Sequence, residues 1–585
     1  MTVIPPEEFA PLAAEILSGR RRLISWGGDL DAARVNHWQC PLPIDHLTDA
    51  NWYKWNIRIE DFRCPPPTCL ELENADQVAV VTHYYLGQTY AGVKDFLERI
   101  PGLRHFVPTQ LSRALQADTG IDDLALLDEV IFGYGGLRDN GDGARKLLAA
   151  APLGPHHCRA RRLIEEVRRN RRLVEGKRVA LFIEQMNPGG AERQICALAI
   201  GLRRKGWDVT LVNQRPWPQD AAHYRQSLEG QGIHTIEAPP LVPSEGVAWG
   251  PHVLDMVGRE AGRLIWHLPH LLVPGTLALC RVLADIRPDL LVCYLDRPNL
   301  IGGVAGCLTG VPNILMSGRN LNPCHFPNFY RGQLVDFHEV YSLLEGLAGV
   351  RLSANSRRGA ESYADWLGRP VDDIPVIPNG VIEEAFQTGT PALRQAVKQL
   401  SGIPPDRRIL LGVFRLSEEK NPHLFVEVAA RLLAEYPDLH AVVCGGGALE
   451  GSIRADLRQR GIEAFFTLLS GVSAMPPLMR ASSLLLHTSR AEGTPNALLE
   501  AQAAGLPIVC TQTGGSEDCL SPAARPHAHP QGETEALVAS CRQILADPAE
   551  ARRLIRAGRA HVRRHHSLDT LATATLAPFA PSTDR

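Results

Sequence analysis

Residues 490–501 read Arg490-Ala491-Glu492-Gly493-Thr494-Pro495-Asn496-Ala497-Leu498-Leu499-Glu500-Ala501. Thr494 is expected to cap a helix with Pro495 at its first helical position, because a hydroxyl accepts from free N–H groups and proline lacks an N–H. The other N–H groups at this helix start would bind an anion. Glu492 precedes the start, and Glu500 lies roughly 9 Å along the axis at about 1.5 Å per residue. We therefore expect the two carboxylates to hold different parts of one extended ligand.

Two other enzyme classes fit the sequence poorly. Glycosidases hold two carboxyl groups about 5–5.5 Å or about 6.5–9.5 Å apart across one bond, and two acids along a helix start fit neither geometry well. An NAD enzyme would need a G-x-G-x-x-G loop, but Gly445-Gly446-Gly447-Ala448-Leu449-Glu450 has a glutamate at the last glycine position. Both classes are therefore disfavoured.

Glu492 and Glu500, with seven residues between them, resemble the signature of the retaining glycosyltransferases of family 4, which have the GT-B fold. The resemblance implies that Glu492 contacts hydroxyls of the transferred sugar and that Glu500 takes the ribose hydroxyls of the donor. It also implies that the backbone after Glu492 meets the sugar and the diphosphate. This gives a donor-binding set of Gly493, Thr494, Pro495 and Asn496. The alternative is a surface helix with two solvated glutamates.

A buried strand over residues 407–414 runs into a loop that carries Arg415 and Lys420 and precedes an amphipathic helix. We expect both cations to face the donor diphosphate. A leaving nucleoside diphosphate gains negative charge as the glycosidic bond breaks, so fixed cations stabilise the transition state more than the ground state. The alternative is a salt-bridged turn that involves Glu418 and Glu419.

A third segment joins a strand at Val179–Ile183 to Gly189-Gly190-Ala191-Glu192-Arg193, a motif similar to one in the N-terminal domain of the same transferases. Paired glycines allow backbone to approach a ligand closely, so Gly189 and Gly190 join the expected donor site. A plain tight turn is the alternative. Weaker matches occur at 353–356, 377–381 and 445–447, and the family order extends over residues 177–575, about two thirds of the chain.

The alternation of strands and helices predicts an α/β protein of the GT-B type, in which two Rossmann-like domains with parallel sheets face each other across a cleft. An N-terminal extension, either α/β or mostly helical, precedes them. The expected parts are the extension (1–160), a basic linker helix (161–176), the acceptor-side domain (177–385), the nucleotide-sugar domain (386–565) and a tail that crosses back (566–585). The expected strands lie near 178–183, 207–213, 289–295, 312–316 and 350–354, and then near 408–414, 439–444, 465–470, 483–488 and 507–511.

Composition excludes several other classes. The chain has 585 residues, 45% of them hydrophobic and 21% charged, with a formal net charge of −3, which argues against a nucleic-acid partner. No secretory signal is recognised near the start, and the apolar stretch 264–283 is broken by charged residues and proline, so it reads as a buried helix. Thirteen scattered cysteines suit a reducing cytoplasm. We therefore expect a cytoplasmic protein.

Two features suggest further contacts. The basic segment 159–172 has a short apolar stripe, so it reads either as a solvated connector helix or as a helix that rests peripherally on an anionic membrane. Cys64 and Cys69, with His37 and Cys40 upstream, have irregular spacing for zinc, and no metal is expected there.

The expected reaction transfers a sugar from a nucleoside diphosphate donor, with UDP as the favoured nucleotide, to a glycan or lipid-linked acceptor of a bacterial surface polysaccharide. Arg415, Lys420 and Glu492 form the expected catalytic set. The base is expected near Leu469 and Gly471. Arg319 and Asn320 are expected to face the cleft. No metal or other cofactor is expected, because the only Asp-x-Asp triplet, at residues 29–31, lies outside the matching region. The alternatives are a non-catalytic GT-B subunit of a polysaccharide-synthesis complex and a nucleotide-sugar epimerase.

Overall fold

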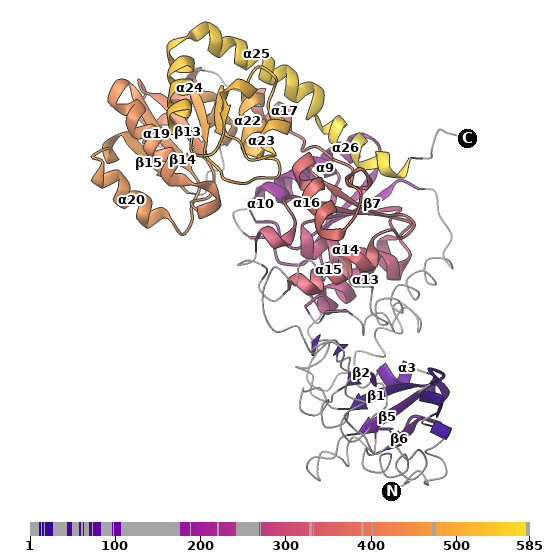
Figure 1. Ribbon diagram of the computed structural model, residues 1–585. Coiled ribbons are helices and arrows are strands. Elements are labelled where there is room, and N and C mark those ends of the chain that lie inside the picture. Colours follow the sequence, from indigo (N-terminus) through magenta and orange to yellow (C-terminus); the bar gives the residue numbers. More distant parts are fainter. Residues whose placement is uncertain are drawn as a thin grey trace.

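The computed structural model describes parts of an N-terminal region and most of the rest of the chain (Figure 1). The described residues are 11–12, 14–16, 18–26, 44–48, 58–59, 62–63, 69–72, 74–82, 96–97, 99–106, 176–187, 189–218, 222–240, 268–269, 271–326, 330, 333–387, 391–400, 402–470 and 475–580.

The N-terminal region contains a parallel four-stranded sheet in the order β2-β1-β5-β6. Ile24 of β1 and Val80 of β5 are fully buried, and Trp26 packs its ring 5.7 Å from that of Phe96. Of the two alternatives for the extension, the described residues therefore form an α/β arrangement. Its elements are β1 (Arg22–Trp26), β2 (Ile44–Thr48), β3 (Arg58–Ile59), β4 (Phe62–Arg63), α3 (Cys69–Leu72), η2 (Ala75–Gln77), β5 (Val78–Thr82) and β6 (Arg104–Phe106).

The first lobe, which comprises β7 to α16 together with α26, is built on a parallel six-stranded sheet in the order β12-β11-β10-β7-β8-β9. Its central strands are continuous apolar runs because both faces are covered by helices. Along β7, Ala180 and Phe182 face α13 to α16, whereas Val179, Leu181 and Ile183 face α9, α10 and α26. The strands are β7 (Arg178–Ile183), β8 (Asp208–Asn213), β9 (His234–Glu237), β10 (Leu290–Tyr294), β11 (Asn313–Gly318) and β12 (Val350–Ala354).

The helices of the first lobe follow its strands, as right-handed βαβ crossovers require. They are α9 (Gly190–Arg204), α10 (Ala222–Glu229), α13 (Val273–Ile286), α14 (Asp296–Thr309), η4 (Pro323–His325), α15 (Leu334–Leu344) and α16 (Arg357–Leu367). Three connecting helices then lead to the second lobe: η5 (Val371–Asp373), α17 (Glu383–Gln387) and α18 (Pro391–Leu400).

The second lobe, from β13 to α25, repeats this plan with a parallel six-stranded sheet in the order β15-β14-β13-β16-β17-β18. Every residue of β14 is buried, as its apolar sequence predicts. The strands are β13 (Arg408–Val413), β14 (Leu439–Cys444), β15 (Phe466–Leu469), β16 (Leu484–His487), β17 (Ile508–Thr511) and β18 (Ala528–His529). The helices are η6 (Glu418–Lys420), α19 (Pro422–Glu435), α20 (Glu450–Gln459), η7 (Glu463–Phe465), α21 (Met475–Ala481), α22 (Asn496–Ala504), α23 (Ser516–Cys519), η8 (Arg525–His527), α24 (Thr534–Ala546) and α25 (Pro548–His565).

The chain returns to the first lobe at its end. Val381 N donates to His566 O at 2.8 Å, and His566 Nδ1 lies 2.9 Å from Asn379 O, so the outgoing and returning segments run side by side. Helix α26 (Leu568–Leu576) then packs on α9, where a Cβ added to Gly201 would lie 2.7 Å from the carbonyl oxygen of Leu568. Figure 1 shows α26 beside α9, and η9 (Ala577–Phe579) ends the described chain.

Candidate functional site

The order of strands in the second lobe opens a crevice above β13 and β16. The chain proceeds from β13 outward to β14 and β15, and then returns to the other side of β13 to form β16. The loops after β13 and β16 therefore leave their strands in opposite directions, which is where ligands bind in parallel α/β sheets. Arg415 and Lys420 follow β13, and Glu492 follows β16, so the topology brings the predicted catalytic residues to one edge.

Backbone contacts join these two loops. The Thr488 hydroxyl donates to the carbonyl oxygens of Lys420 at 3.2 Å and Asn421 at 3.1 Å. Arg490 N donates to Glu419 O at 2.8 Å. Asn421 has a φ of 49°, a left-handed conformation that asparagine tolerates better than most residues and that turns the chain from η6 into α19. The loops consequently form one unit, and Lys420 is directed at the segment after β16.

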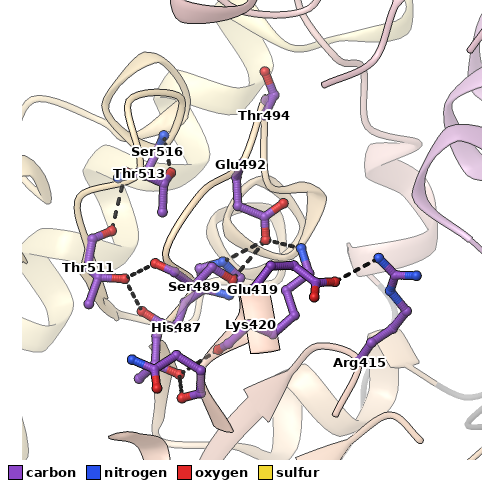
Figure 2. A network of polar contacts seen from close by, with 12 residues as sticks. Arg415, Glu419, Lys420, His487, Ser489, Glu492, Thr494, Thr511, Thr513 and Ser516 are labelled. Carbon is purple, nitrogen blue, oxygen red and sulfur yellow. Dashed lines mark hydrogen bonds and ion pairs between the residues drawn. The ribbon is translucent and has the colours of Figure 1, made fainter. Parts of the chain in front are cut away.

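An ion pair between Lys420 and Glu492 lies at the centre of this unit (Figure 2). The Ser489 hydroxyl donates to the same Glu492 oxygen at 2.9 Å, and His487 Nε2 lies 3.4 Å from it. Burial acts to raise the pKa of Glu492, but Lys420 and His487 outweigh it and hold this pKa well below its ordinary value. The carboxylate is therefore ionised near neutral pH. Sequence reasoning missed His487 and Ser489, whose only signal was their position at the end of an apolar strand.

Arg415 lies at the edge of the same unit and pairs with Glu419 at 3.0 Å (Figure 2). This is one of the pairs considered in the salt-bridged turn alternative. The Arg415 side chain is 75% exposed, so the pair contributes little to stability and leaves the guanidinium accessible to a ligand. The turn and a phosphate-binding role are compatible.

The start of α22 differs from the sequence expectation. The helix begins at Asn496, Pro495 occupies the N-cap position, and no side chain caps the helix. The Thr494 hydroxyl instead donates to the carbonyl oxygen of Asn355 in the first lobe at 2.6 Å. The prediction of a Thr494 cap was therefore wrong, because a hydrogen bond between the lobes uses the hydroxyl that local capping would need.

Amide side chains hold the two lobes together at this helix start. Asn496 Nδ2 donates to Gly190 O at 2.9 Å, and Asn496 Oδ1 accepts from Asn379 at 2.6 Å and from Gln194 at 3.1 Å. Gln194 and Gly380 also exchange two hydrogen bonds of 2.8 Å. The structure thus brings together Gly190 and Asn496, which the sequence assigned to one donor site, and adds Asn379 and Gln194, which it did not.

Glycines allow the close packing around Glu492. A Cβ on Gly493 would lie 2.8 Å from Asn355 Oδ1 and 3.1 Å from the Cα of Asn320 across the cleft. A Cβ on Gly515, in the loop after β17, would lie 1.3 Å from the carbonyl oxygen of Gly493. In the first lobe, a Cβ on Gly189 would lie 2.2 Å from a carboxylate oxygen of Glu192.

Glu500 lies further along α22 and pairs with Arg193 of α9 at 3.0 Å. Burial raises the pKa of Glu500, and the charge of Arg193 opposes this shift. The expected ribose ligand is thus a buried carboxylate that faces an arginine of the first lobe.

The remaining predicted residues have varied positions. Leu469 ends β15, and its carbonyl accepts from Gly445 N at 2.8 Å. Gly471 lies outside the described residues. Arg319 is buried, stacks 4.2 Å from the centroid of the Tyr294 ring, and donates to Asn379. Contact of Arg319 with an acceptor, which stays a prediction, would require this guanidinium to leave its protein partners.

Several other predictions concern residues outside the described part of the chain. They include the basic segment 159–172, His37, Cys40 and Cys64. Within the described ranges, no cluster of three or more His, Cys, Asp or Glu side chains is arranged to hold a metal ion. None of the helices described is both long enough and apolar enough to cross a bilayer.

The two parallel-sheet lobes and the crevice between them define a glycosyltransferase of the GT-B type. Residues 394–561 match the family described as Glycosyl transferases group 1, and residues 188–385 match Glycosyltransferase Family 4. The chain belongs to glycosyltransferase family 4, and the predicted fold class is confirmed.

The chain is similar to two bacterial proteins of polysaccharide metabolism. It is 26% identical over 392 residues to the Vi polysaccharide biosynthesis protein VipC/TviE of Salmonella typhi, a match that covers 63% of this chain and 66% of that protein. It is 27% identical over 252 residues to the UDP-Gal:alpha-D-GlcNAc-diphosphoundecaprenol alpha-1,3-galactosyltransferase of Escherichia coli, with coverage of 42% and 62%. The chain thus spans somewhat less than two thirds of the length of these relatives.

A solved structure shares the fold. Anabaena Alr3699/HepE, in complex with UDP and glucose, has a TM-score of 0.54 and 16% sequence identity over 69% of this chain and 99% of that chain.

Proposed function

We propose that this chain transfers a sugar, with retention of anomeric configuration, from a nucleoside diphosphate donor to a glycan or lipid-linked acceptor. The observation that carries the proposal is the pair of Lys420 and Glu492 at the crevice above β13 and β16. An ionised carboxylate accepts hydrogen bonds from sugar hydroxyls, and an ammonium group beside it attracts the adjoining phosphate. Both charges are fixed before the ligand arrives, so they cost little reorganisation during the reaction.

In the proposed reaction, an acceptor hydroxyl attacks the anomeric carbon from the face that the diphosphate leaves. A carbon–oxygen bond to the acceptor forms, the bond between the anomeric carbon and the phosphate oxygen breaks, and a phosphate oxygen receives the hydroxyl proton. Arg415 and Lys420 stabilise the charge that develops on the leaving diphosphate. Glu492 orients the sugar through its hydroxyls. These residues supply the cations, so we expect no requirement for a divalent metal.

We further propose a UDP-sugar as donor and a bacterial surface polysaccharide or its lipid-linked precursor as acceptor. The support comes from the names of the relatives, which concern Vi polysaccharide and a UDP-galactose-dependent transfer to a diphosphoundecaprenol acceptor, and from the UDP bound to HepE. A lipid-linked acceptor would place the reaction at the cytoplasmic face of the cell membrane.

A panel of nucleotide sugars tests this function in two stages. Thermal unfolding is measured with each compound, because a ligand at about 100 times its Kd adds about 2.7 kcal/mol to the free energy of unfolding. The compound that stabilises most is then incubated with the protein, with and without membrane lipid extract as acceptor. Transfer only with acceptor supports the proposal. A new nucleotide sugar formed without acceptor would indicate an epimerase, and neither transfer nor donor hydrolysis with the full panel would indicate a non-catalytic subunit.

A further inference from the structure

One side chain of the first lobe reaches the carboxylate expected to bind the donor ribose. Arg193 lies in the first turn of α9, and its Nε is 3.0 Å from Oε1 of Glu500 on α22. The Glu500 side chain is only 10% exposed, whereas that of Arg193 is 37% exposed. The hydroxyl of Tyr224, on α10, also interacts with this guanidinium. The ion pair thus joins the two lobes inside the crevice.

A second ion pair between α9 and the following part of the chain shows what is distinctive here. Arg204 pairs with Glu384 at 3.1 Å, but these side chains are 51% and 61% exposed. Exposed pairs of this kind contribute little, because water screens both charges. In contrast, removing Arg193 would leave the buried Glu500 carboxylate without a cation, which strongly disfavours its charged form. Arg193 therefore determines the state of Glu500 in a way that Arg204 cannot for Glu384.

The Glu500 carboxylate can accept more than the Arg193 contact. An ionised carboxylate has about four lone-pair sites on its two oxygens. Among the residues that the structure describes, Arg193 is the one charged group recorded against Glu500, and the recorded contact is to Oε1. Acceptor capacity for two hydroxyl donors therefore remains beside the ion pair.

We propose that Arg193 is a positioning residue of the donor site, which keeps the Glu500 carboxylate charged and oriented to accept the two ribose hydroxyls of the nucleotide. This inference rests on the proposed function, which assigns the ribose to Glu500. It adds that the ribose site is built by both lobes, since the carboxylate comes from α22 and the group that orients it comes from α9. Binding of the nucleotide ribose is then coupled to contact between the lobes.

The experiment compares two ligands in four proteins. UDP, GDP, ADP and CDP are titrated by calorimetry against the wild-type chain, and the tightest is then compared with its 2′,3′-dideoxy analogue. We expect the wild type to prefer the ribose form at least about tenfold, because hydrogen bonds to a charged group are lost in the analogue. Arg193→Ala should reduce this preference to below about threefold by weakening the ribose form, and Arg193→Lys should restore part of it. Arg204→Ala is the matched control and should retain the wild-type preference.

The possible results separate the inference from the function on which it rests. If the wild type binds none of the four diphosphates, or does not distinguish the two forms, the ribose assignment fails and the inference fails with it. If the wild type discriminates and Arg193→Ala keeps the same preference, the ribose site stands and the role of Arg193 is refuted. Equal weakening of both ligands would indicate a merely structural residue, and tighter binding of both would indicate that Arg193 competes with the nucleotide. Circular dichroism of each variant verifies folding.

Discussion

Replacement of Lys420 by methionine removes the cation that faces Glu492 while keeping most of the apolar stem. The two side chains are 15% and 14% exposed, so the pair is largely buried. Breaking a buried ion pair by removing one partner costs about 3–5 kcal/mol, since the other charge remains without compensation. Ser489 and His487 remain beside the Glu492 carboxylate. We therefore expect a loss at the lower end, about 3 kcal/mol in the free energy of unfolding of the second lobe.

The same substitution should lower turnover at least about tenfold, which corresponds to about 1.4 kcal/mol of barrier. Urea unfolding followed by circular dichroism measures the first effect, and transfer from the donor identified by the panel measures the second. The decisive variant combines Lys420→Met with Glu492→Gln. It removes both charges, so stability should recover in part, whereas turnover should remain low because both proposed roles need a charge. Wild-type turnover in the single variants, or an unchanged unfolding free energy in Lys420→Met, would refute the reasoning.

Three further predictions concern the same site. The pKa of Glu492 is lowered on folding, so its ionised form contributes stability above the unfolded pKa of about 4.5, and the advantage of the wild type over Glu492→Gln should shrink as the pH falls below that value, as urea midpoints measured across pH would reveal. Gly515→Ala, whose Cβ would meet the Gly493 carbonyl, should lower turnover about a hundredfold, as a misplacement of about 1 Å can; Gly451→Ala in α20 meets nothing within 4 Å and is the control. Treatment with EDTA should leave the transfer rate unchanged, and activity restored only by magnesium or manganese would contradict the proposed roles of Arg415 and Lys420.

Much of the fold could be predicted because its strands are buried on both faces. Runs such as Val179–Ile183 and Leu439–Cys444 have few other uses than a parallel sheet covered by helices, and the observed strands lie within one or two residues of the predicted ones. The edge strands β9 and β18 were missed. His234–Glu237 is polar and partly exposed, and β18 has two residues, so their pairing depends on the neighbouring strand and not on a pattern of their own.

The site was less predictable than the fold, since its contacts join distant segments. Lys420 and Glu492 are 72 residues apart, and it is the adjacency of β13 and β16 that makes them partners. The sequence assigned each to a ligand and did not indicate their mutual pairing. Gln194 and Asn379 carry no chemical signal in isolation, because amides become informative only when their partners are known. Thr494 had a clear local signal, and a contact from the other lobe overrode it.

The return of α26 to the first lobe has a consequence for biosynthesis. Leu568, Leu571 and Ala572 belong to the same core as β7 and α9, although the whole second lobe is translated between them. At roughly 5–20 residues per second, a ribosome needs about 10–40 s to add the roughly 190 residues that separate Val381 from this helix. During that interval the apolar groove on α9 is open, and a nascent chain must keep it from aggregating. The second lobe can mature while the first one waits for the end of translation.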